Sequence, residues 1–121
     1  LASVIEKEVR SVEDMKIVSG IFQNRMEIGQ ALQSCATLAY ILGEDKPVYT
    51  IEDTQIDSPY NTYVNLGLPP TAISNPGIEA IKAAANPQPT DNLFFLTGLD
   101  GKMYYAETHE GHVKNKNHYL K

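Results

Sequence analysis

Apolar residues in the first twelve positions recur at a helical spacing. At about 100° per residue, the segment 1–12 places its apolar side chains on one stripe: Leu1, Val4, Ile5, Val9 and Val12. Glu8 lies in the middle of that stripe, whereas Glu6 lies at its edge and Lys7 points away. Burial of a carboxyl group favours the neutral acid and raises its pKa, which is what a general acid requires. The pattern therefore predicts Glu8 as a proton donor; the alternative is a helix that ends near Arg10 and leaves Glu8 solvated.

Capping signals predict the next two helices. Ser11 begins a motif that resembles a capping box, S-V-E-D, and predicts a helix that runs to about Ile28 and stops at Gly29. Its apolar face comprises Met15, Val18, Ile21, Phe22 and Met26. The short connection predicts that the first two helices pack as a hairpin. Ser34 can cap a third helix over 36–42 that Gly43 ends, and 44–47 is expected to form a loop.

The second half of the chain begins with an irregular stretch. Residues 57–76 contain four prolines, three asparagines and two tyrosines, and they show little periodicity. A turn of helix is predicted near 51–54. Asn75-Pro76 predicts a helix over 76–85, with the asparagine as N-cap and the proline in the first turn. Asp100-Gly101, between the apolar runs 93–97 and 102–106, predicts a β-hairpin.

Thr108 can cap a last helix that extends to about Leu120. The sum is an α+β fold, a mostly helical single domain with a small antiparallel hairpin. The length of 121 residues suits one modest core, and 42% hydrophobic residues are typical of a globular protein. No apolar run is long enough for a membrane span and no signal peptide is visible. Because the sequence opens without Met, in an apolar helical pattern, we expect an excised domain of a longer protein.

The net charge and the number of cysteines exclude several kinds of partner and site. The formal net charge is −5, which argues against a nucleic-acid partner; the C-terminal lysines (Lys114, Lys116, Lys121) are read as a solvated face. Cys35 is the single cysteine, so an internal disulfide and a multi-cysteine zinc site are excluded. We expect it to be a small buried side chain.

The loop around residues 58–63 has a composition that suits a carbohydrate. Tyr60 and Tyr63 can stack on the faces of sugar rings, while Asn61 and Thr62 can hydrogen-bond to hydroxyls. The alternative is a structural turn whose tyrosines fill the core. Gln33 and Ser34 could bring an amide and a hydroxyl to the same cleft, although helix capping is the competing role for Ser34.

Other kinds of catalytic site have little support. The chain has no G-x-S-x-G elbow, and His109 and His112 lie three apart without a further ligand in obvious reach, so neither a metal nor another cofactor is expected. A hydrolytic glycosidase would pair its acid with a second carboxylate. Asp53 or Asp57 could be that partner, but both lie in turns that favour Asp. A single acid fits another reaction, in which it protonates the glycosidic oxygen and then deprotonates a hydroxyl of the sugar, which attacks the anomeric carbon.

Several segments together resemble a known family. They are LASVIEKE (1–8), GIFQNRMEIGQALQS (20–34), SPYNTYVNLGLPP (58–70), ISNPGIEAIKAAANP (73–87) and LFFLTGLDGKMYYAET (93–108). In their order and spacing they resemble the C-terminal catalytic domain of the endolytic murein transglycosylases, the YceG-like (MltG) family. The resemblance covers most of the chain.

This resemblance implies an enzyme that cuts the β-1,4 bond between N-acetylmuramic acid and N-acetylglucosamine inside glycan strands and leaves a 1,6-anhydro end. It implies a membrane-anchored protein at the outer face of the cytoplasmic membrane, whose anchor is absent from this chain. Glycan strands are the expected partner, and the resemblance suggests cell-wall synthesis proteins as further partners. The catalytic glutamate of the E-K-E motif falls on Glu8, with Glu6 as the fallback. The glycan is expected to contact Gln33, Ser34, Tyr60, Asn61, Thr62, Tyr63 and Asn75.

The chain also departs from the family pattern. Where members often read L-Q-S-D-P-T, it has Cys35 and Ala36, which puts an acidic role at position 35 in doubt. Val9 replaces a common Thr, and Thr71 a common Gly. Two alternatives to a transglycosylase stay open: a hydrolytic muramidase and a non-catalytic peptidoglycan-binding module.

Overall fold

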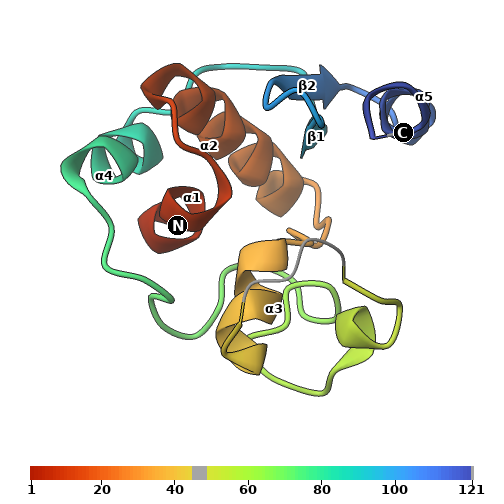
Figure 1. Ribbon diagram of the computed structural model, residues 1–121. Coiled ribbons are helices and arrows are strands. Elements are labelled where there is room, and N and C mark those ends of the chain that lie inside the picture. The colour runs from red at the N-terminus through yellow and green to blue at the C-terminus, as the bar shows by residue number, and fades with distance from the viewer. Residues whose placement is uncertain (45–48, 121) are drawn as a thin grey trace.

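The computed structural model describes residues 1–44 and 49–120, and its elements confirm the mostly helical α+β fold (Figure 1). Apart from Glu44, the loop predicted over 44–47 lies outside the described residues. In chain order the elements are α1 (Ala2–Glu8), α2 (Val12–Glu27), α3 (Cys35–Leu42), the 3-10 turn η1 (Asp53–Gln55), α4 (Ile78–Ala85), β1 (Phe94–Thr97), β2 (Met103–Ala106) and α5 (His109–Tyr119).

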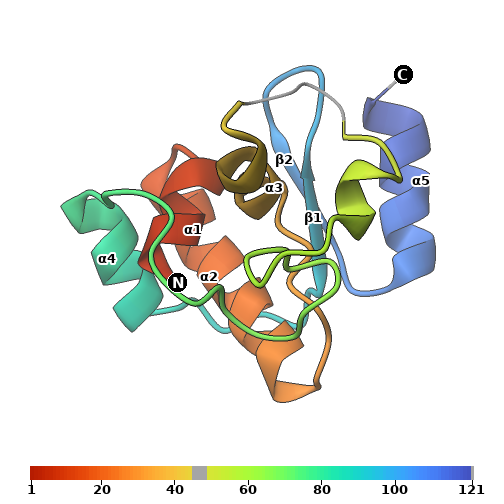
Figure 2. The ribbon, with the colours of Figure 1, turned by 90° about the horizontal axis from the view of Figure 1, so that it is seen from below.

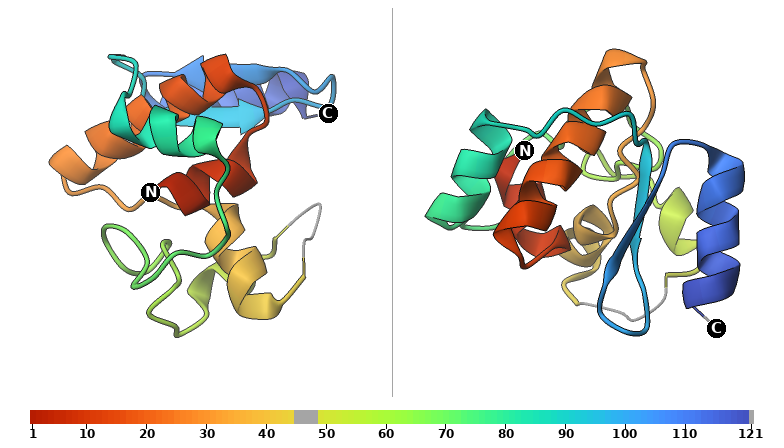
Figure 3. Two further views of the ribbon diagram at one scale, coloured as in Figure 1. Left: turned by 90° about the vertical axis from the view of Figure 1, so that its left-hand side faces the viewer. Right: turned by 90° about the horizontal axis from the view of Figure 1, so that it is seen from above.

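The helices α1, α2 and α4 pack together on one side of the molecule, and α3 lies with the irregular loop on the other side of α1 (Figures 1 and 3). The two strands and α5 lie beyond α2, as the view from below also shows (Figure 2). The core fills the space between α1, α2 and α4 and includes the fully buried Val4, Ile5, Val18, Phe22 and Leu32.

The first helix is shorter than the apolar pattern predicts. It ends at Glu8, because Val9 is extended with φ −142° and ψ 158° and the chain turns before α2. Val9 is nevertheless buried, whereas Val12 starts α2 and is 41% exposed. The predicted continuous stripe to Val12 is therefore wrong. The helix ends early, as the alternative stated, but Glu8 is not left solvated as that alternative also required.

The predicted caps are confirmed at two helices. The Ser11 hydroxyl accepts a hydrogen bond from the Asp14 N–H at 3.1 Å, and Thr108 accepts one from the Gly111 N–H at 3.1 Å. The left-handed glycine stops are also confirmed: α3 ends at Gly43, with φ 73°. These signals are local in sequence, which is why they can be recognised without the fold.

Helix α4 begins later than predicted. It starts at Ile78, and its N-cap is Gly77 rather than Asn75. The Gly77 N–H donates to Oε1 of Glu6 at 2.5 Å, so a carboxylate from α1 takes the place of a local capping side chain. The expected helical role of Asn75-Pro76 is thus wrong, because the partner comes from 71 residues away in the sequence.

The hairpin is confirmed within one residue at each strand. Strands β1 and β2 are antiparallel, with Phe94 opposite Ala106 and Thr97 opposite Met103. In the connecting turn Gly101 has φ 81° and the Gly98 N–H donates to the Lys102 carbonyl. Helix α5 packs against both strands, so the sheet has one helix on its outer side.

Candidate active site

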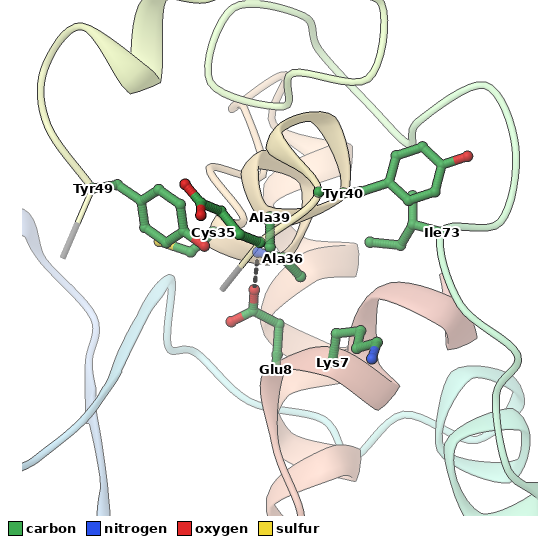
Figure 4. A pocket seen from close by; sticks show the side chains of 10 residues that line it. Lys7, Glu8, Cys35, Ala36, Ala39, Tyr40, Tyr49 and Ile73 are labelled. Atoms are coloured by element: carbon green, nitrogen blue, oxygen red, sulfur yellow. Dashed lines mark hydrogen bonds between the residues drawn. The ribbon is translucent and has the colours of Figure 1, made fainter. Parts of the chain in front are cut away.

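Glu8 points from the last residue of α1 toward the first turn of α3 (Figure 4). Its Oε1 accepts two hydrogen bonds, from the Ser34 hydroxyl at 2.6 Å and from the Ala36 N–H at 3.0 Å. No described residue donates a hydrogen bond to Oε2. One oxygen of the carboxyl group is therefore fixed by the protein, and the other is left for a ligand.

The hydrogen bonds to Glu8 follow from the way α3 begins. The first N–H groups of a helix have no partner inside the helix and need an acceptor. Ser34 is the N-cap of α3, but its side chain makes no capping hydrogen bond. It donates to Glu8 instead, and Glu8 accepts from Ala36 in the first turn. The predicted side-chain capping by Ser34 is wrong, because Glu8 rather than Ser34 accepts the hydrogen bond from the first turn of α3.

Glu8 lies at the border between two pockets. The first has a volume of about 410 Å³ and is lined by Lys7, Ala36, Ala39, Tyr40, Gly43, Glu44, Tyr49 and Ile73 as well as by Glu8 and Cys35. The second has a volume of about 350 Å³ and lies between the sheet, α5 and the irregular loop. Because Glu8 and Cys35 line both pockets, a chain-like ligand that passes from one to the other would cross the free oxygen of Glu8.

The surroundings of Glu8 hold its pKa above the ordinary value. Burial is the main cause. The hydrogen bonds from Ser34 and Ala36 and the positive charge of Arg25 act in the opposite direction and favour the carboxylate. Glu8 is thus an acid whose neutral form is favoured by burial and whose anion has partners ready, as a group that gives up and regains a proton needs.

The four residues of the loop 58–63 that were expected to contact a glycan divide into two groups. Asn61 and Thr62 are buried, with 0% and 2% of their surface exposed. The Asn61 amide donates to the carbonyls of Thr54 and Ile56 and accepts from the Tyr63 N–H, so it holds the loop in shape. These two side chains have no surface to offer a glycan, contrary to expectation.

The two tyrosines of the loop lie at or near the pockets. Tyr63 lines the second pocket, and its hydroxyl is 3.2 Å from the Cys35 Sγ. Tyr60 packs beside Tyr40, which lines the first pocket; the ring centroids are 5.0 Å apart. Through this contact with Tyr40 the Tyr60 ring supports the wall of the first pocket, and its hydroxyl lies 2.9 Å from that of Thr71.

Thr62 connects the loop to the base of the site. Its Oγ1 accepts from the Ser34 N–H at 2.9 Å and lies 2.9 Å from the Thr37 hydroxyl. Its main-chain carbonyl accepts from the Gln33 N–H at 3.2 Å. Gln33 is exposed, lines the second pocket and has a φ of 52°, a left-handed conformation that is rare outside glycine. Thr62 thus holds Ser34, and Ser34 holds Glu8.

Two expected residues lie away from the pockets beside Glu8. Glu6 is engaged with Gly77 at the start of α4, and Asn75 is exposed and lines neither pocket. Asp53 and Asp57 also line neither pocket; Asp53 accepts from the Thr50 N–H within a turn. Among the described residues, the carboxylate that shares a pocket with Glu8 is Glu44, which was predicted to lie in a loop and was not a candidate site residue.

Arg25 is the other site residue that the sequence analysis missed. It is 4% exposed, and its guanidinium donates to the main-chain carbonyls of Leu93 and Leu32. It also lies over the Phe94 ring, 5.4 Å from the centroid. The sequence carried a signal, since Arg25 follows Val18 and Phe22 at helical spacing on the apolar face of α2.

The expectation that Cys35 is buried is wrong, because Cys35 is exposed where the two pockets meet. Partial desolvation of its sulfur raises the pKa of the thiol. His112 stacks on Phe94, and burial with the nearby positive charge of Lys116 lowers its pKa to about 4. No group of three or more metal-binding side chains occurs in residues 1–44 and 49–120.

No helix within the described parts of the chain is long and apolar enough to span a bilayer.

Known proteins share both sequence and fold with this chain. A protein named endolytic murein transglycosylase from Streptococcus pneumoniae is 39% identical over 95% of this chain. A protein of the same name from Bacillus subtilis is 38% identical over 99% of this chain. The chain spans only 22% and 33% of those relatives.

The crystal structure of a YceG-like protein from Listeria monocytogenes has the same fold. It superposes with a TM-score of 0.88 at 44% identity, over 93% of this chain and 37% of that one. The sequence profile of the YceG-like family matches residues 1–118. Profile, relatives and fold agree over nearly the whole sequence, and the chain belongs to the YceG-like family.

Proposed function

We propose that this chain is the catalytic domain of an endolytic peptidoglycan lytic transglycosylase. It would cut the β-1,4 bond between N-acetylmuramic acid and N-acetylglucosamine and leave a 1,6-anhydro end. The observation that carries the proposal is the position of Glu8, a carboxyl group with a raised pKa at the border of two pockets. The names of the relatives, endolytic murein transglycosylase, support the same substrate.

Glu8 would act first as the acid. Because both hydrogen bonds from the protein go to Oε1, the proton of the neutral acid belongs on Oε2. Oε2 gives that proton to the glycosidic oxygen while the bond from this oxygen to the anomeric carbon breaks. The carboxylate that results is stabilised by Ser34, by the Ala36 N–H and by the charge of Arg25.

Glu8 would then act as the base. The carboxylate takes the proton of the C6 hydroxyl of the muramic acid, whose oxygen attacks the anomeric carbon and closes the anhydro ring. No water is consumed, and Glu8 ends in its starting, protonated form. Gln33 and Tyr63 would contact the glycan in the second pocket, while Tyr40, beside Tyr60, would contact it in the first.

The test compares two variants of the same helix. Glu8→Gln keeps the size of the side chain and its acceptor oxygen but cannot donate the acid proton, so release of anhydro-muropeptides should fall by at least about a hundredfold. Glu6→Gln makes the same charge change two residues away and should retain most of the activity. Wild-type rates in the Glu8 variant, or loss of activity only in the Glu6 variant, would refute the assignment.

A hydrolytic muramidase is the second candidate, and the presence of Glu44 in the first pocket favours keeping it. A second carboxylate could activate water, which would leave a reducing end. Mass spectrometry separates the reactions because the hydrolytic product is one water heavier. If hydrolysis is the reaction, Glu44→Gln should abolish it; if the anhydro product forms, Glu44→Gln should leave that product unchanged in mass.

We further propose that the chain acts outside the cytoplasmic membrane, as part of a longer anchored protein that works beside the cell-wall synthesis machinery. Murein lies on that side of the membrane, and the relatives are three to five times as long as the region they share with this chain. Labelling of an exported tag on the whole protein by a membrane-impermeant reagent would test the location.

A further inference from the structure

The second pocket carries more positive charge than the proposed acid–base chemistry uses, because that chemistry involves the charge of Arg25 but not that of Lys116. Arg25 and Lys116 both line it, and Glu8 is the only acidic residue among its lining side chains. Two cations therefore face a single acidic side chain in this pocket, that of Glu8, whose neutral form is favoured by burial. A pocket of this kind attracts an anionic group of a ligand.

One nitrogen of the Arg25 guanidinium makes no hydrogen bond to the described residues. Its Nε donates to the Leu93 carbonyl at 2.7 Å and its Nη1 to the Leu32 carbonyl, whereas Nη2 has no acceptor in the described parts of the chain. Nη2 is not buried either, because His112 Nδ1 is the one side-chain atom of the described residues that is both buried and unpartnered. Arg25, which is 4% exposed as a residue, thus keeps a donor open to the pocket that it lines.

A buried cation without a counter-ion is costly, and an anionic ligand would remove that cost. Arg25 forms no ion pair with any residue that the structure describes. Its position is fixed by two main-chain carbonyls and by the ring of Phe94, so it offers a preorganised donor rather than a mobile one.

Lys116 approaches the same pocket from α5. That helix is held against the sheet by the Asn115 amide, which donates to the Tyr105 carbonyl, and by His112, which stacks on Phe94. The charges of Lys116 and Arg25 both contribute to the lowered pKa of His112, which lines the same pocket. The electrostatic effects of the two cations therefore overlap there. By contrast, Lys114 on the same helix lines neither pocket at the site and lies 3.9 Å from Glu110.

We propose that the second pocket binds a carboxylate of the stem peptide of peptidoglycan, through Arg25 Nη2 and Lys116 Nζ. This inference rests on the proposed function for the choice of ligand. The stem is attached to the lactyl group of muramic acid, next to the bond that Glu8 would cut, and it carries free carboxylates. The pocket adjoins Glu8, so it is within reach of a substituent on that sugar. Arg25 and Lys116 would then select glycan with acidic stems over glycan whose stems are neutral.

The experiment measures binding rather than cleavage. The ligands are two forms of a muramyl tetrasaccharide with stem peptides, one with free stem carboxylates and one with those carboxylates amidated. The protein is the 121-residue chain with Glu8→Gln, which prevents turnover during titration calorimetry. We expect the acidic form to bind about five to ten times more tightly, with the ratio falling as salt increases.

Two matched variants locate the effect. Lys116→Gln should clearly reduce the ratio of the two affinities, because Arg25 then acts alone, whereas Lys114→Gln, with the same charge change on the same helix, should keep the ratio. Equal affinities in the starting protein, a ratio that survives Lys116→Gln, or no binding of either form would each overturn the proposal. Cleavage without a carboxylate preference would refute this pocket assignment and leave the proposed function standing; a preference without cleavage of either form by the wild-type chain would do the reverse.

Discussion

Replacing Glu8 by glutamine should make the protein more stable at neutral pH. In the wild-type fold, burial raises the pKa of Glu8 above its unfolded value of 4.5. Between these two pKa values the folded state binds more protons than the unfolded state, so the free energy of unfolding falls as pH rises. Below the unfolded pKa the contribution of the neutral acid is fully present, and above the folded pKa it is lost.

The magnitude follows from linkage. Each unit by which the folded pKa exceeds 4.5 lowers the stability above that pKa by about 1.4 kcal/mol. Glutamine cannot ionise, and its amide oxygen can still accept from Ser34 and Ala36. For a domain of this size, about 1 kcal/mol corresponds to roughly 4 °C in Tm. Glu8→Gln should therefore raise Tm by several degrees at pH 8 and by much less at pH 4.

Thermal unfolding followed by circular dichroism at a series of pH values measures the effect. Glu13→Gln is a suitable control, because this exposed carboxylate in the first turn of α2 should change stability by less than about 0.5 kcal/mol. A Glu8→Gln variant that is less stable than wild type at pH 8, or a difference that does not vary with pH, would show that Glu8 is not a buried acid in the folded protein.

One further variant tests the hydrogen bond that positions Glu8, and two test contacts that stabilise the fold. Ser34→Ala removes a hydrogen bond that favours the Glu8 anion, so the alkaline limb of kcat/KM should move up by about one pH unit; an unmoved limb would contradict this. Glu6→Gln weakens the charged cap at Gly77 and should cost about 1 kcal/mol in urea unfolding, with an unchanged stability as the contrary result. Gly20→Ala places a methyl group against the carbonyl of the segment after α4 and should cost about 2 kcal/mol or more by the same assay, unless that segment shifts freely.

The sequence predicts the elements that depend on local signals. The capping serine at position 11, the capping threonine at 108, the left-handed glycine at 43 and the Asp-Gly turn each act within a few residues, and each is found where it was expected. The family resemblance, which uses several such segments together, is confirmed as well. Periodicity was less successful for α1, because Val9 stays buried after the helix has ended and extends the apolar pattern beyond it.

The features that escaped prediction depend on contacts between distant segments. Glu6 replaces Asn75 as the cap of α4, and Glu8 replaces the Ser34 side chain at the start of α3. Neither pairing can be recognised from the local sequence, because the residues around a glutamate in α1 are the same whether or not its side chain accepts a hydrogen bond from another helix. Asn61 and Thr62 likewise look like sugar ligands until the fold shows that their hydrogen bonds are used inside the protein.

The two glutamates of α1 show how one short helix serves both stability and the proposed chemistry. Each carboxylate meets the beginning of another helix, Glu6 at α4 and Glu8 at α3. At α4 the arrangement is complete, because the Gly77 N–H is satisfied. At α3 one oxygen of Glu8 accepts hydrogen bonds and the other accepts none from the residues that the structure describes, and burial opposes ionisation. The same arrangement therefore stabilises the start of α4 and, at α3, presents a carboxyl group with a raised pKa where the two pockets meet.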